Sequence, residues 1–213
     1  MIAIIDYEAG NLRSVERALK KLGVTCCITQ IPQEIADAER IIFPGVGAAG
    51  KAMSDLKALG LDRVILDAFL ESKPIIGICL GTQIILEGSE ENRAECLGLL
   101  KGKVKRFPEA LQSGKPDGVQ LKIPHMGWNQ VHFKKQHPVF QGIRKEDEFY
   151  FVHSYYPSPE RDDQIIGETE YGIRFPSIIG FRNLVAVQFH PEKSGRAGLK
   201  ILGNFCEWDG HAE

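Results

Sequence analysis

Short apolar runs alternate with amphipathic segments through the first ninety residues of the chain. β-Branched and aromatic runs predict strands at Ile2–Ile5, 24–29, 40–43 and 74–78. Helix-spaced apolar positions between these runs predict helices, over 11–22 with Asn11 as cap and Gly23 as end, 52–59 and 61–71. This order predicts an α/β fold with a mainly parallel sheet and helices on both faces.

Strand-like runs crowd together in the second half of the chain, with little helix between them. The runs are 104–107, 119–123, 131–133, 149–153, 165–169, 177–181 and 184–189. Their spacing indicates antiparallel hairpins, with Arg182 and Asn183 forming one tight turn. A last helix is expected over 195–208, and 109–117 is expected to be an exposed loop. We expect one domain over 1–213.

Composition narrows the function classes. The net charge of −2 in 213 residues gives no basic field for nucleic acid or an anionic membrane. No basic leader precedes the first apolar run, and no apolar run reaches membrane-spanning length. The five cysteines are odd in number and show no C-x-x-C spacing, so neither disulfides nor a zinc site is favoured. We expect a cytoplasmic protein.

The stretch 73–86, K-P-I-I-G-I-C-L-G-T-Q-I-I-L, carries the first candidate chemistry. An apolar strand turns into a helix at Cys79, and Gly77 and Gly81 leave room for a sharp turn. This is the sulfur version of the nucleophile elbow, in which a helix N-terminus favours the thiolate. Cys79 could equally be a small buried hydrophobic residue at a strand end.

His190, Pro191 and Glu192 follow another buried-type strand. The carboxyl ends of parallel strands form one rim, so His190 could face Cys79 as its base while Glu192 orients the imidazole. Taken alone, the tripeptide could also be a surface turn with a solvated glutamate.

A glycine-rich turn, P-G-V-G, occupies 44–47 after the strand 40–43. Such a turn lets backbone N–H groups approach a ligand closely. The stretch lacks both the G-x-x-x-x-G-K-[ST] and the G-x-G-x-x-G patterns, so a phosphate loop or a dinucleotide site is disfavoured.

Together, G-I-C-L-G-T-Q at 77–83 and H-P-E at 190–192 resemble the class I, triad-type glutamine amidotransferases. Four more motifs are similar to the glutaminase subunits of imidazole glycerol phosphate synthase in histidine biosynthesis: D-Y-x-x-G-N-L at 6–12, P-G-V-G at 44–47, P-H-M-G-W-N at 124–129 and F-V-H-S-Y at 151–155. The resemblance implies the three-layer, flavodoxin-like amidotransferase fold. Glu8 departs from that pattern, which has glycine there.

The resemblance also implies roles for individual residues. Cys79 would attack glutamine, His190 would move the proton and Glu192 would orient His190, giving glutamate and ammonia without a metal or cofactor. The implied oxyanion hole lies at Gly47 and Leu80. The implied glutamine-binding residues are Gln83, Glu91, Ser154 and Tyr155.

A cyclase subunit, a (β/α)8 barrel that receives the ammonia, is the implied partner in a heterodimer. Asn11, Trp128 and Lys193 would face it, although Trp128 could also be a core residue. His125 and His153 lack further ligands at useful spacing, so we interpret both as structural or interface residues rather than metal ligands.

Three alternatives stay open at this point. The chain could be a related glutaminase that feeds ammonia to a different synthase. It could also be a free-standing cysteine hydrolase on the same fold, or a binding protein that has lost catalysis. The intact Cys79, His190 and Glu192 argue against the last.

Overall fold

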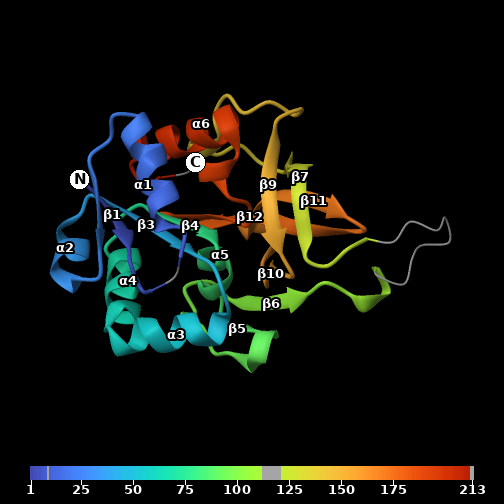
Figure 1. The fold of residues 1–213 in the computed structure, drawn as a ribbon, viewed down its shortest axis with the longest axis horizontal. Helices are drawn as coiled ribbons and strands as arrows, with labels where there is room; N and C mark the ends of the chain where they lie inside the picture. Colours follow the sequence, from blue (N-terminus) through green and yellow to red (C-terminus); the bar gives the residue numbers. More distant parts are fainter. Residues whose placement is uncertain (9, 112–120, 212–213) are drawn as a thin grey trace.

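A computed structural model describes residues 1–8, 10–111 and 121–211. Its central sheet has eight strands (Figure 1). Their order across the sheet is β2 (Cys26–Thr29), β1 (Ile2–Ile5), β3 (Arg40–Gly45), β4 (Ile75–Cys79), β13 (Leu184–Val187), β12 (Ile173–Phe181), β11 (Ile165–Tyr171) and β8 (His132–Phe133). The pairs from β2 to β13 are parallel and those from β13 to β8 are antiparallel. The predicted fold class is confirmed.

Helices cover both faces of this sheet (Figure 1). They are α1 (Leu12–Lys21), α2 (Pro32–Asp37), α3 (Ala49–Ala58), α4 (Leu61–Leu70), α5 (Leu80–Ile84) and α6 (Gly195–Glu207). Within the described ranges, no helix is long and apolar enough to cross a membrane.

The parallel strands divide their side chains between two apolar cores because successive residues of a strand point to opposite faces. Ile41 and Phe43 of β3 pack in the core that contains residues of α2, α3 and α4. Ile42 packs in the other core, which contains residues of α1 and α6. Both faces of β3 are therefore buried in apolar cores, which explains its continuous apolar run.

The antiparallel half contains the predicted turn. Phe181 pairs with Leu184, and Arg182 and Asn183 connect them as a two-residue turn in which Arg182 has φ 56°. Two smaller sheets lie beside this half. One consists of β10 (Tyr155–Pro159), β6 (Gly102–Arg106) and β5 (Gly88–Ser89), and the other of β7 (His125–Gln130) and β9 (Glu148–His153).

Several expected elements differ from those observed. The strand predicted over 119–123 is wrong for 121–123, because these residues form no strand. The strand here is β7, which begins at His125. Pro124 precedes it and has no N–H to donate to a neighbouring strand. Residues 119–120, and 112–117 of the predicted loop, lie outside the described residues. The described start of that loop is a 3-10 turn, Glu109–Leu111, whose last residue is buried rather than exposed. α2 and β10 were not predicted.

Candidate active site

Cys79 lies at the corner between β4 and α5, with φ 54° and ψ −104°. L-residues rarely adopt this conformation, and such strain concentrates at functional sites. Tight packing holds the corner in place. A Cβ on Gly81 would lie 1.9 Å from the carbonyl oxygen of Phe43, and one on Gly77 would lie 3.1 Å from Cβ of Ala186. The glycines let the helix follow the strand at this angle.

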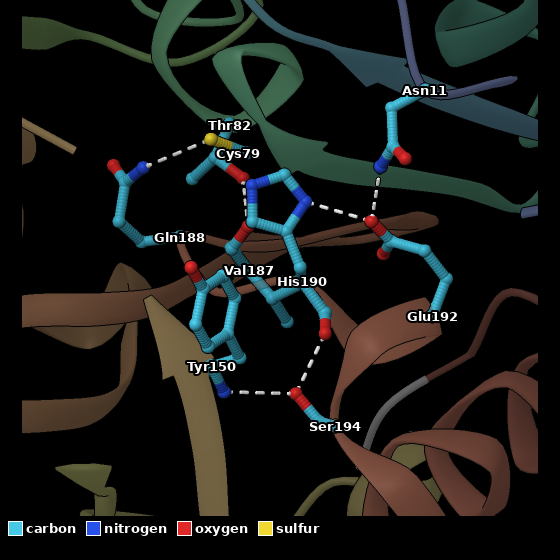
Figure 2. Close-up of polar contacts among 9 residues, drawn as sticks. All are labelled: Asn11, Cys79, Thr82, Tyr150, Val187, Gln188, His190, Glu192 and Ser194. Atoms are coloured by element: carbon cyan, nitrogen blue, oxygen red, sulfur yellow. Dashed lines mark hydrogen bonds and ion pairs between the residues drawn. The ribbon is translucent and has the colours of Figure 1, made fainter. Parts of the chain in front are cut away.

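His190 reaches Cys79 because β13 lies parallel to β4, with Val187 opposite Ile78. Its Nδ1 is 2.7 Å from Oε1 of Glu192. Figure 2 shows the His190 ring between the Cys79 sulfur and the Glu192 carboxylate. The side chains of His190 and Glu192 are 1% and 0% exposed. Glu192 is therefore not a solvated residue of a surface turn.

The charges of this group depend on one another. Burial by itself lowers the pKa of His190, but its interactions with Cys79 and Glu192 outweigh burial and raise the pKa to about 10. The raised pKa favours a proton on the His190 imidazole. Nε2 of His190 is buried and has no hydrogen-bond partner among the described residues, so it is free to exchange a proton.

Asn11 completes the surroundings of Glu192. Its side-chain amide donates to the same Oε1 that His190 contacts (Figure 2). The prediction that Asn11 caps α1 is wrong: its φ is 77° and it makes no side-chain cap hydrogen bond. A cap would use Oδ1 of Asn11 as an acceptor, whereas this bond uses its amide N–H as a donor, and hydrogen bonds to a charged carboxylate are stronger than those between neutral groups.

A cavity of about 320 Å³ opens beside Cys79. It brings together the sequence-predicted catalytic, oxyanion-hole and substrate residues other than Glu192. Its lining consists of Val46, Gly47, Cys79, Leu80, Gln83, Glu91, Pro124, Val152, His153, Ser154, Tyr155 and His190. Asn11, Trp128 and Lys193 do not line it.

The 44–47 turn and Glu91 meet at one end of this cavity. Gly47 has φ 109°, a value that favours glycine, and open space surrounds the position of its absent Cβ. Oε2 of Glu91 accepts a hydrogen bond from the backbone N–H of Ala49, the first residue of α3, at 2.7 Å. The half-buried Glu91 is therefore held at the N-terminus of α3, where a negative charge is stabilised.

Gln188 was not singled out from the sequence, although the structure places its side chain against Cys79. Its Nε2 donates to Sγ of Cys79 at 3.8 Å, and its Oε1 accepts from Nε2 of Gln83 at 3.1 Å. The sequence did contain a signal for this contact, because Gln188 is the one polar residue in the apolar run L-V-A-V-Q-F at 184–189. An amide in a buried strand needs partners, so its position pointed to a polar neighbour.

The exposed side of the β7–β9 pair carries two of the largest accessible apolar side chains. Met126 is 61% and Trp128 is 54% exposed, so Trp128 is not a core residue. Tyr150 of β9 lies opposite Trp128 in the strand pair, with the centroid of its ring 6.0 Å from that of Trp128 and 5.8 Å from Nζ of Lys193. Glu8 is exposed and has φ 65°, a conformation that glycine adopts more easily.

The imidazole rings of His125 and His153 contact each other. Nδ1 of His125 is 3.0 Å from Nε2 of His153, and both rings are buried. Among the described residues, no group of three or more His, Cys, Asp or Glu side chains is arranged to hold a metal ion.

Comparison with known proteins places this geometry in context. Residues 3–207 match the family described as glutamine amidotransferase class-I. Imidazole glycerol phosphate synthase subunit HisH of Maridesulfovibrio salexigens is 50% identical over 208 residues, covering 98% of this chain and 97% of the relative. The protein of the same name from Nitratidesulfovibrio vulgaris is 50% identical over 205 residues, covering 96% and 95%. The solved structure of PurLQS from Thermotoga maritima has a chain with the same fold, with a TM-score of 0.71, 18% identity and 97% of each chain covered.

Proposed function

Because the chain belongs to the class-I glutamine amidotransferase family, among the HisH subunits of imidazole glycerol phosphate synthase, we propose that it hydrolyses glutamine to glutamate and ammonia and passes the ammonia to a cyclase subunit. One observation carries the chemistry. A strained cysteine and a buried histidine line one cavity, and a buried glutamate contacts the histidine at Nδ1, as nucleophilic catalysis by a triad needs.

The proposed reaction has two halves. The proton of Cys79 passes to Nε2 of His190 first, and Sγ then attacks Cδ of the glutamine side chain. His190 then gives that proton to the departing nitrogen, and ammonia leaves a glutamyl thioester on Cys79. Water attacks the thioester and loses a proton to His190, which returns it to the sulfur as glutamate departs. Glu192 keeps the imidazole oriented through Nδ1 in each step.

The cavity supplies the remaining proposed roles. Leu80 begins α5 directly after Cys79, so its N–H belongs to a helix N-terminus, and we assign it with Gly47 to the oxyanion hole. Glu91 offers a carboxylate for the substrate ammonium group. Gln83, Ser154 and Tyr155 line the same cavity and would contact the α-amino and α-carboxylate end.

The patch around Trp128 is the proposed docking face for the cyclase, a (β/α)8 barrel, in a heterodimer. Exposed aromatic residues and methionine are enriched at such contacts, and Lys193 lies next to the Tyr150 ring there. Asn11 connects α1 to the catalytic glutamate. All five cysteines are free thiols, in keeping with the cytoplasm as the proposed location.

The test is glutamine hydrolysis by the purified chain, alone and with the cyclase subunit and its nucleotide ligand. We expect a large rise when both are added, and no activity in Cys79→Ala under any condition. A rise with a different ammonia-dependent synthase would replace the proposed partner. Turnover of peptides without any synthase would replace the amidotransferase assignment by a cysteine hydrolase.

A further inference from the structure

Gln188 and His190 reach the Cys79 sulfur from two sides (Figure 2). His190 is the proton acceptor of the proposed mechanism, whereas Gln188 has no role in it. The Gln188 side chain is fully buried, and its Nε2 lies 3.8 Å from Sγ of Cys79. Gln188 can stabilise a thiolate on Cys79 only if the N–H end of its amide, rather than the oxygen, faces the sulfur. An N–H donor stabilises a thiolate, and an oxygen repels it.

A backbone carbonyl fixes which end of Gln188 faces the sulfur. The two ends of a glutamine amide have nearly the same shape, so only the hydrogen-bond network can assign them. The carbonyl oxygen of Tyr155 can only accept, and Gln83 lies 3.0 Å from it, so Gln83 must present Nε2 there. The same Nε2 lies 3.1 Å from Gln188, which must therefore present Oε1 to it. The N–H end of Gln188 is left to face Cys79.

The other side of the Tyr155 carbonyl is fixed in the same way. Nδ1 of His153 lies 2.7 Å from that oxygen and must carry the proton that it donates. Nε2 of His153 then accepts from Nδ1 of His125 at 3.0 Å, and Nε2 of His125 accepts from the amide of Asn129 at 3.3 Å.

Neutral imidazoles are required for this chain of donors and acceptors. Burial lowers the pKa of His125 to about 4 and that of His153 to about 3, so each ring carries one ring proton at neutral pH. The hydrogen bonds from Asn129 through His125 and His153 to the Tyr155 carbonyl therefore all run in one direction. The Tyr155 carbonyl accepts two of the hydrogen bonds described, one from His153 and one from Gln83. The orientation of Gln188 does not depend on the substrate.

We propose that Gln188 is a catalytic residue that stabilises the thiolate of Cys79 by donating a hydrogen bond, with its direction fixed by Gln83 and the carbonyl of Tyr155. Glutamine hydrolysis then uses two groups on the sulfur. His190 takes the proton, and Gln188 stabilises the resulting negative charge on the buried cysteine. The inference rests on Cys79 as the nucleophile of the proposed function.

The test measures alkylation of Cys79 by iodoacetamide, followed by mass spectrometry of the Cys79 peptide. Gln188→Met keeps the length of the side chain and removes the donor. We expect its alkylation rate at neutral pH to fall about ten-fold, the effect of one hydrogen bond to a charged group, and to approach the unsubstituted rate at high pH. Equal rates at neutral pH in a folded Gln188→Met would overturn the proposal.

Gln164→Met is the matched control, because Gln164 is also a buried glutamine and does not line the cavity. Its alkylation rate should remain unchanged. An equal fall in both variants would mean that any buried glutamine matters, and the proposal would fail. Alkylation requires neither glutamine nor a partner, so a different substrate or synthase would leave this result intact.

A measurement on the unsubstituted chain covers the case in which Gln188→Met does not fold. The side-chain N–H resonances of Gln188 in a ¹⁵N-labelled sample should shift with pH as the thiolate forms. The shift should be absent in Cys79→Ala. Resonances that do not respond to pH, or that respond equally in both proteins, would refute a hydrogen bond to the sulfur.

Discussion

Asn11 donates its side-chain amide to Oε1 of Glu192, across a separation of 181 residues in the chain. The same oxygen accepts a hydrogen bond from Nδ1 of His190 (Figure 2). Oε2 of Glu192 is buried and has no partner among the described residues. The Glu192 carboxylate, which we propose orients the His190 imidazole, therefore has two donors at one oxygen, and one of them comes from the residue just before α1.

Asn11→Ala should impair catalysis more than binding. It removes one of the two donors to a buried carboxylate, and we expect kcat for glutamine to fall roughly ten-fold, with KM little changed because Asn11 does not line the cavity. Steady-state kinetics with the partner present would measure both constants.

Asn204→Ala provides the control for that substitution. Asn204 donates to the carbonyls of Val139 and Gln141, so its loss should lower the free energy of unfolding and leave kcat unchanged. If Asn11→Ala affects only stability, as Asn204→Ala should, then the Asn11–Glu192 bond has no part in catalysis.

Cys79→Gly should be more stable than Cys79→Ala, the reverse of the usual order. Both variants lack the sulfur, so their difference reports the backbone at φ 54° and ψ −104°. We expect a difference of about 1 kcal/mol in the free energy of unfolding, because only glycine adopts that region without strain. Urea unfolding of the two inactive proteins gives the difference directly. An alanine variant that is equally or more stable would show that the corner is unstrained.

Gly81→Ala should disrupt the elbow, because the added methyl group would lie 1.9 Å from a backbone oxygen of β3. We expect a loss of about 3 kcal/mol or more in the free energy of unfolding, or no folded protein, since backbone cannot move aside as a side chain can. Gly50→Ala in α3 is the matched control. Its nearest neighbour would be the Cβ of Ala94 at 3.9 Å, so it should be neutral or stabilising by up to about 1 kcal/mol. Similar losses of unfolding free energy in the two variants would contradict the interpretation that the close contact at Gly81 excludes a side chain.

His137 should make the fold sensitive to acid. Burial, with a smaller effect of Lys135, lowers its pKa from 6.5 to about 4. The unfolded chain therefore binds more protons between these values, so this contribution to stability is present above pH 6.5 and is lost as the pH falls towards 4. Removing the group should reduce the slope of stability against pH in that window by up to about 1.4 kcal/mol per pH unit.

His137→Asn tests this expectation while keeping an acceptor for the N–H of Val139, to which Nδ1 of His137 now bonds. The exposed His132 offers the control, and His132→Asn should leave the slope unchanged. Unfolding free energies between pH 4 and pH 6.5 provide the measurement. Identical slopes in the two variants would rule out His137 as a source of acid sensitivity.

Local patterns were sufficient for much of the fold. The buried run of β1, the elbow at Cys79 and the turn at Arg182 all follow from residues adjacent in the chain, because strand, helix and turn preferences act over a few positions. The motifs also specified the family. Elements with weak local signals were missed: α2 is only six residues long, and β10 contains two prolines.

The sequence by itself determined the architecture, the family and the candidate catalytic residues, since all three follow from periodicity and from motifs of consecutive residues. Only the tertiary structure decided the partners of those residues. Asn11 binds Glu192 instead of capping its own helix, and Gln188 faces Cys79 because β13 and β4 are parallel neighbours. A side-chain amide can pair with many acceptors, and the fold brings one of them within reach.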